Sequence, residues 1–159
     1  MSDELLLTQL ASEREHALHA VDGLTEAEMN APLVPSGWTI TRLLNHLAFD
    51  GEMFWISAVL GGDPEAIAAL HNGWASRPMP GAEAVNIYRH QIRRSNRILA
   101  KVDLDDPPRW WPPASEFAAQ PMREGREVVF RVLTETSTHA GHLDIVRELI
   151  DGHQNLVVN

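Results

Sequence analysis

Residues 134–151 read TETSTHAGHLDIVRELID, and this stretch combines the period of a helix with residues that bind metals. Glu135, His139 and His142 recur at spacings of four and three, so they share one stripe of a helix with about 3.6 residues per turn. A carboxylate and an imidazole one turn apart can reach the same ion. The stretch therefore predicts a helix that carries a candidate metal site on one face.

Three residues on one helix do not close a coordination sphere, and the missing ligand is expected upstream. His46 lies in the apolar segment LLNHLAFD and is the candidate, although an isolated histidine among leucines is more often a hydrogen-bonded core residue. Asp50, one turn later, could ligate, orient His46 or simply face solvent. A charged Glu135–His139 pair without any metal is the competing interpretation.

Helical periodicity runs through most of the chain, and no stretch shows a convincing strand alternation. We expect a single domain with an all-α fold, a four-helix bundle with a short extra helix and long connecting loops. In the first helix, Glu13, Arg14 and Glu15 are expected mostly on the side opposite the apolar residues. Thr25 and Glu28 form a capping-box pattern that opens a short helix. Thr39 is the expected N-cap of the second long helix, and Gly152 the expected stop of the last. The long helices are expected at about residues 4–22, 39–60, 82–102 and 124–150, with shorter ones at 25–28 and after residue 64.

The composition narrows the possible functions. The 159 residues carry 22 Asp and Glu against 13 Lys and Arg, a net charge of -9, which makes nucleic acid an unlikely partner. There is no cysteine, so a metal must be held by nitrogen and oxygen ligands, and a reacting sulfur must arrive on a small molecule. The sequence shows neither a signal peptide nor an apolar run of membrane-spanning length, and we expect a cytoplasmic protein without a membrane partner.

The connection between residues 103 and 125 is rich in proline and tryptophan and long for a compact domain. Loops of this kind are usually lids or pocket walls. Trp110 and Trp111 could cover the open end of the bundle, and Arg109 and Arg123 could bind a carboxylate or sugar of a cofactor. A hydrophobic plug without substrate contact is an equal alternative for the two tryptophans.

Three motifs together resemble the DinB-like superfamily: PLVPSGW at 32–38, WTITRLLNHL at 38–47 and ETSTHAGHLDIVRELIDG at 135–152. Within it, the chain resembles a branch of bacterial proteins whose last helix reads E-T-x-x-H-A-G-H-x-D, related to mycothiol-dependent maleylpyruvate isomerase. The resemblance extends from the first helix to about Gly152. One departure is that Ser137 and Thr138 stand where alanine and arginine are expected.

The resemblance implies a four-helix bundle, often a homodimer, with a divalent metal held by His46, Glu135 and His139. It also implies a transferase or isomerase that uses a low-molecular-weight thiol such as mycothiol or bacillithiol on a small-molecule substrate. Two imidazoles and a carboxylate suit zinc first, and also nickel, iron or manganese. His142 is the better candidate for a catalytic base and Asp50 the second. A metal-dependent hydrolase and a non-catalytic stress-response protein that binds a metal or ligand are the alternatives.

Overall fold

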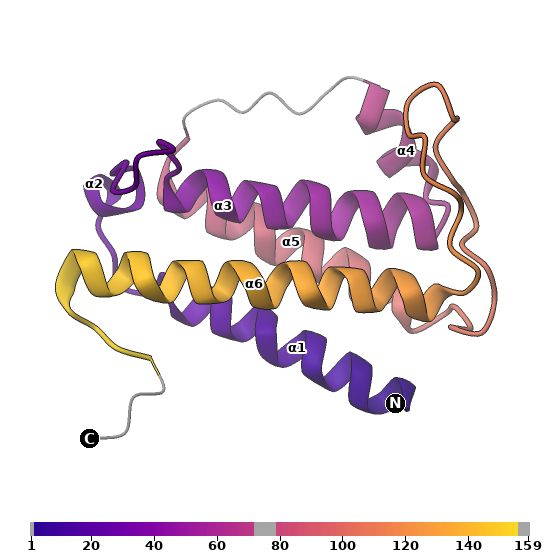
Figure 1. The fold of residues 1–159 in the computed structure, drawn as a ribbon, viewed down its shortest axis with the longest axis horizontal. Helices are drawn as coiled ribbons and strands as arrows, with labels where there is room; N and C mark the ends of the chain where they lie inside the picture. Colours follow the sequence, from indigo (N-terminus) through magenta and orange to yellow (C-terminus); the bar gives the residue numbers. More distant parts are fainter. Residues whose placement is uncertain (1, 72–78, 156–159) are drawn as a thin grey trace.

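The computed structural model describes residues 2–71 and 79–155. Within these residues the fold is all-α, as predicted, and its body is a bundle of four long helical segments (Figure 1). The sequence also predicts a loop that holds Trp74 and Pro78 after the short helix, and these two residues lie outside the described residues. The helices are α1 (Asp3–His19), α2 (Glu26–Met29), α3 (Ile40–His46), η1 (Leu47–Leu60), α4 (Pro64–His71), α5 (Gly81–Leu99) and α6 (Gly125–Asp151).

Local sequence signals fix most helix ends. Thr25 and Glu28 form the reciprocal capping box that opens α2, and the Thr39 hydroxyl accepts a hydrogen bond from the Arg42 amide at the start of α3. Gly152 ends α6 with a φ of 77°, a left-handed conformation that glycine adopts without strain. The first helix ends at His19 rather than Asp22, because the chain turns at residues 20–23.

The second long helix changes its hydrogen bonding part of the way along. From Leu47 to Leu60 it is a π-helix, and the Gly61 amide at its end bonds the Ile56 carbonyl five residues back. The sequence predicts an ordinary α-helical period here, so the wider turns of the π-helix differ from the prediction. Widened turns of this kind occur frequently at functional sites, and this one begins directly after His46.

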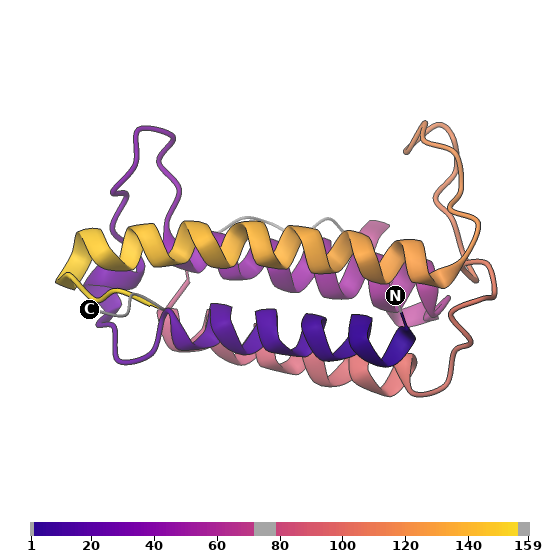
Figure 2. The ribbon, with the colours of Figure 1, turned by 60° about the horizontal axis from the view of Figure 1, so that its bottom comes forward.

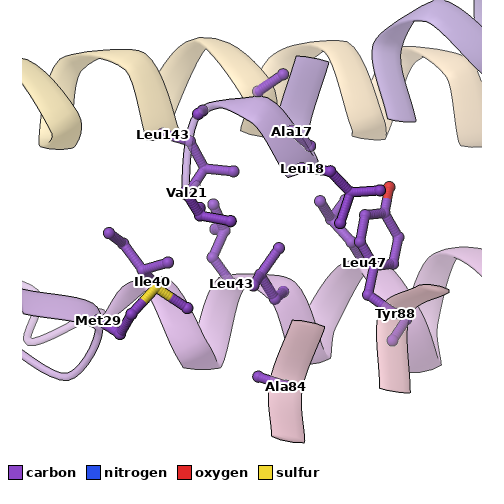
Figure 3. Close-up of a cluster of buried hydrophobic side chains, with 14 of the residues drawn as sticks. Ala17, Leu18, Val21, Met29, Ile40, Leu43, Leu47, Ala84, Tyr88 and Leu143 are labelled. Atoms are coloured by element: carbon purple, nitrogen blue, oxygen red, sulfur yellow. The ribbon is translucent and has the colours of Figure 1, made fainter. Parts of the chain in front are cut away.

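The core consists of separate buried clusters along the bundle axis. At one end Leu44, Leu47 and Tyr88 are fully buried and pack against residues of α1 and α6 (Figure 3). At the other end Trp55 and Val132 belong to a second buried cluster. Each buried leucine stabilises the fold by roughly 1.5–3 kcal/mol relative to exposure. This packing fixes α3 and η1 against α6.

One prediction for the first helix is wrong. Arg14 is 3% exposed and forms a two-pronged ion pair with the equally buried Glu52 of η1, with Nε–Oε1 and Nη2–Oε2 distances of 2.7 and 2.6 Å. A third nitrogen donates to Asn96 of α5 at 2.9 Å. Arg14 follows Leu10 by four residues, so it lies on the inward stripe, where Glu52 neutralises its charge.

Two loops rise on the same side of the bundle at its opposite ends (Figure 2). One is the connector of residues 31–39 before α3, and the other is the connection of residues 103–124 before α6. They flank the face that α3, η1 and α6 form together. Among the described residues, no helix is long and apolar enough to cross a membrane.

Candidate metal centre

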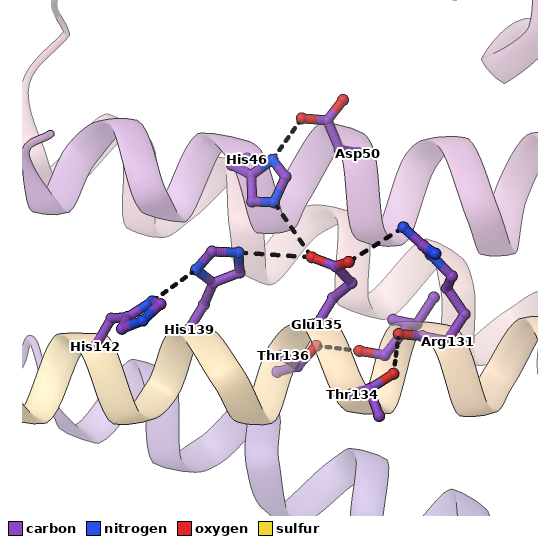
Figure 4. A network of polar contacts seen from close by, with 9 residues as sticks. His46, Asp50, Arg131, Thr134, Glu135, Thr136, His139 and His142 are labelled. Carbon is purple, nitrogen blue, oxygen red and sulfur yellow. Dashed lines mark hydrogen bonds and ion pairs between the residues drawn. The ribbon is translucent and has the colours of Figure 1, made fainter. Parts of the chain in front are cut away.

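His46, Glu135 and His139 converge from two helices, as the sequence predicts (Figure 4). One potential ligand atom from each residue lies within 4.8 Å of the other two. Glu135 Oε2 is 3.7 Å from His46 Nε2 and 3.6 Å from His139 Nε2. The two imidazole rings meet edge to face with centroids 4.8 Å apart. The cluster is half-buried, so a small molecule can approach it.

Asp50 lies behind His46, one turn further along the helix. Its Oδ2 is 2.6 Å from His46 Nδ1, and because a carboxylate only accepts, the ring nitrogen donates. This bond leaves the Nε2 lone pair of His46 directed towards Glu135. The hydrogen bond with Asp50 raises the pKa of His46 despite partial burial, with help from the charges of Asp50 and Glu135. A proton therefore competes with a metal ion for His46.

The surroundings of His139 lower its pKa, whereas those of His46 raise its pKa. Burial lowers the pKa of His139, and the neighbouring His46 and His142 lower it further. Its imidazole is therefore neutral near neutral pH, which is the form that binds metals. His142 is exposed, and its Nδ1 lies 3.3 Å from Nδ1 of His139. The two nitrogens form a hydrogen bond in which one ring donates and the other accepts.

Arg131 is a member of this neighbourhood that the sequence reasoning missed. Its Nη2 lies 3.2 Å from Glu135 Oε1, the oxygen that faces away from the histidines, and its guanidinium covers the Trp55 ring at 5.3 Å. The four-residue spacing between Arg131 and Glu135 on one helix indicates this contact, because residues four apart on a helix are neighbours. Ser137 and Thr138 are exposed, and at position 138 no arginine is present to bind an anion.

The residues expected to bind a cofactor do not gather at the cluster. Trp111 packs on Trp55 with ring centroids 6.0 Å apart, and Trp110 belongs to the same hydrophobic cluster. The backbone amide of Arg109 bonds the Leu60 carbonyl at the end of η1. Arg123 precedes α6, so His139 lies more than about 20 Å further along that helix.

The other histidines described in the structure lie away from the cluster. The sequence predicts surface or loop positions for these histidines, but His16 is only 21% exposed and its Nε2 lies 2.8 Å from Asp144 Oδ2. His19 and His90 are exposed, and so is His153, whose ring lies 6.3 Å from that of His19. None of these four histidines forms a three-ligand set with described carboxylates or histidines.

Comparison with known proteins gives a family that agrees with this geometry. A search of curated proteins found no match. The family model described as Mycothiol-S-transferase matches residues 5–152, which span every helix of the bundle and all three residues of the cluster. The chain belongs to the mycothiol S-transferase family.

Proposed function

We propose that the protein is a divalent-metal-dependent S-transferase that joins a low-molecular-weight thiol, mycothiol or bacillithiol, to a small electrophile. Family membership supports a thiol transferase. The observation that carries the metal dependence is the convergence of His46, Glu135 and His139 within 4.8 Å. The absence of cysteine from the chain agrees with a thiol that comes from outside.

The donor set fits a divalent cation. Ligands about 2.1 Å from a tetrahedral ion lie about 3.4 Å apart. Glu135 Oε2 lies 3.6 Å from His139 Nε2 and 3.7 Å from His46 Nε2, and both distances are close to this value. Two neutral imidazoles and one carboxylate suit zinc best, while nickel, iron and manganese accept the same donors. Three protein ligands leave positions open, which is typical of catalytic rather than structural sites.

The chemistry divides between the ion and the side chains. A bound divalent cation supplies Lewis acidity, which favours the thiolate form of a coordinated thiol. His46, Glu135 and His139 hold the ion, and Asp50 fixes the ring of His46 so that its Nε2 points inward. Arg131 holds the second oxygen of Glu135 and keeps Oε2 directed towards the histidines.

His142 has two possible roles that the geometry separates. If His139 binds the ion through Nε2, its own proton is on Nδ1 and is donated to Nδ1 of His142 across 3.3 Å. His142 then orients His139 and carries its proton on Nε2. The role of a catalytic base, expected from the sequence, requires this contact to open. We propose orientation as its resting role, with proton acceptance from the thiol as a step after the contact opens.

We propose that the loop of residues 103–124 forms one wall of the site that binds the thiol. Trp111 packs against Trp55, Arg131 covers Trp55, and Arg131 contacts Glu135. This chain of contacts connects the loop to the metal centre and supports an indirect role for Trp110 and Trp111. Arg109 and Arg123 are then candidates for polar groups of a thiol that extends along the bundle.

The test is formation of a thioether. Purified protein is assayed with mycothiol and 1-chloro-2,4-dinitrobenzene after zinc loading and after chelation, and the product is identified by mass spectrometry. We expect product formation above the non-enzymatic rate, measured without protein, only with thiol and metal together. Hydrolysis of a model ester or amide substrate without thiol would indicate a hydrolase instead, and a metal-loaded protein without any turnover would indicate a binding protein.

Two further parts of the proposal concern the setting. We place the reaction in the cytoplasm, where low-molecular-weight thiols are kept reduced. We also propose a homodimer, which is the assembly implied by the superfamily resemblance. Sedimentation velocity at several protein concentrations tests the second point, and a monomer at all of them contradicts it.

A further inference from the structure

A pocket of about 520 Å³ opens beside the metal centre, between the connector of residues 31–39 and α6. Its walls are mainly apolar and include Leu43 of α3 together with Leu143 and Val146 of α6. No lysine, arginine, aspartate or glutamate lines it in the part of the chain that is described. This volume is typical of pockets that bind small molecules.

The pocket borders the metal centre at His139. His139 and His142 line its wall, and His139 is one of the three residues of the cluster. A molecule in the pocket therefore contacts the imidazole that is proposed to hold the ion. The apolar walls surround one part of the molecule, while its end at His139 lies beside the proposed reaction centre.

Two large apolar side chains at the pocket remain exposed. Trp38 is 40% exposed and Ile145 60% exposed. The turn at Gly37, with a φ of 74°, delivers Trp38 to a position where its ring meets that of His46 edge to face at 6.1 Å. A molecule that covers Trp38 and Ile145 removes apolar surface from water, which favours binding of an apolar compound.

The positively charged side chain of Arg131 lies on the side of the metal centre away from His139 and the pocket. Arg131 contacts the oxygen of Glu135 that faces away from His139, and Figure 4 shows it on the opposite side of Glu135. Arg42 covers the Trp38 ring at 5.2 Å but does not line the pocket. An anionic group held among the apolar walls, away from the proposed ion, would therefore lose hydration without gaining a cationic side chain as partner.

We propose that this pocket binds the electrophilic co-substrate and that this co-substrate is an uncharged, largely apolar molecule. The inference rests on the proposed function and adds the substrate class. In the reaction a sulfur–carbon bond forms from the thiol to the electrophilic carbon. The bond from that carbon to its leaving group breaks, the leaving group departs as an anion, and the thiol proton passes by way of His142 to solvent or buffer.

The test introduces a positive charge at the rim of the pocket. Zinc-loaded Ile145→Lys is compared with Leu149→Lys, whose side chain is 63% exposed one turn further along α6 and does not line the pocket. Both are assayed with mycothiol and either neutral 1-chloro-2,4-dinitrobenzene or anionic 4-chloro-3,5-dinitrobenzoate. Calorimetry with 1,3-dinitrobenzene, which has no leaving group, measures binding without turnover.

We expect Ile145→Lys to lower kcat/KM for the neutral electrophile about tenfold, the scale set by apolar contacts in a specificity pocket, and to raise it for the anionic one. The Kd of 1,3-dinitrobenzene should rise by a similar factor, while Leu149→Lys and the metal content change little. Equal effects of the two variants, or none, overturn the proposal. Loss of a dimer in Ile145→Lys with unchanged ligand binding also overturns it, because the face is then an interface between copies.

The binding measurement separates this inference from the proposed function. If the metal-loaded wild type forms no thioether, the proposed function is wrong. Weaker binding of 1,3-dinitrobenzene to Ile145→Lys still supports an apolar pocket in that case. Unchanged binding together with normal transferase activity contradicts the pocket assignment alone.

Discussion

His46 Nδ1 and Asp50 Oδ2 lie 2.6 Å apart across one turn of helix, where α3 passes into η1. The same ring presents Nε2 to Glu135 on α6. Carboxylates in this position fix the tautomer and orientation of histidines that bind metals. The relationship therefore connects a local contact within one helix to the proposed metal site between two helices.

Asp50→Ala is expected to weaken metal binding about 10- to 100-fold, the usual effect of removing a carboxylate that orients a histidine ligand. Asp50→Asn is the matched control, because its amide oxygen still accepts from His46 Nδ1. Competition with a chromophoric chelator gives both affinities. Wild-type affinity in Asp50→Ala would show that Asp50 is an ordinary surface residue.

For His142, the informative pair of variants is His142→Asn and His142→Ala. An asparagine oxygen can accept from Nδ1 of His139 but does not titrate near neutral pH. If His142 only orients His139, His142→Asn keeps metal affinity and the pH profile of kcat, while His142→Ala loses about tenfold in affinity. Loss of the pH dependence of kcat in both variants, with metal retained, would assign His142 as the base.

The fold followed from local signals wherever side chain and backbone interact within a few residues. The caps at Thr25 and Thr39 and the stop at Gly152 are examples, and all three are present. Arg14 shows the limit of this reasoning. A charge within an apolar stripe is assigned to solvent unless its partner is known, and Glu52, 38 residues away, is brought to it only by assembly of the bundle.

The Arg14–Glu52 pair provides a stability prediction. Arg14→Met should lower the free energy of unfolding by about 3–5 kcal/mol, because it leaves the Glu52 carboxylate buried without a counter-charge. The double variant with Glu52→Met should recover most of this loss. Urea unfolding followed by circular dichroism measures both. Equal losses in the single and double variants would show that the pair is not the source of the effect.

Asp63 gives a pH-dependent prediction at the start of α4. Partial burial raises the pKa of its carboxyl, but hydrogen bonds from Arg94 and from the amides of Glu65 and Ala66 outweigh this, and the pKa lies below its ordinary value. A lowered pKa in the folded state stabilises the fold above the unfolded-state pKa of about 3.9, and this stabilisation is lost as pH falls.

Asp63→Asn should therefore be less stable than wild type by about 1 kcal/mol at pH 7, on the scale of hydrogen-bonded charges. The difference should shrink below about pH 4, where the unfolded carboxyl is already protonated. Glu65→Gln is the control, since Glu65 also contacts Arg94 but is 86% exposed. Thermal unfolding at pH 3.5, 5 and 7 gives the comparison, and a constant difference across this range would contradict it.

The candidate site was predictable as far as helical spacing reached. The stripe on α6 placed Glu135 next to His139, and the carboxylate–histidine spacing placed Asp50 next to His46. The pocket was not predictable, because Trp38 reaches it through the turn at Gly37 and Ile145 through the packing of α6 against the connector. Contacts of this kind depend on tertiary geometry that a helical period does not contain.

The central claim is that His46, Glu135 and His139 together hold one divalent ion. The direct measurement is the metal content of protein purified without added metal, by elemental analysis, for wild type and His46→Ala, with His90→Ala as a control outside the cluster. We expect close to one equivalent in wild type and His90→Ala and almost none in His46→Ala. Full metal occupancy in His46→Ala would contradict the ligand assignment and the chemistry built on it.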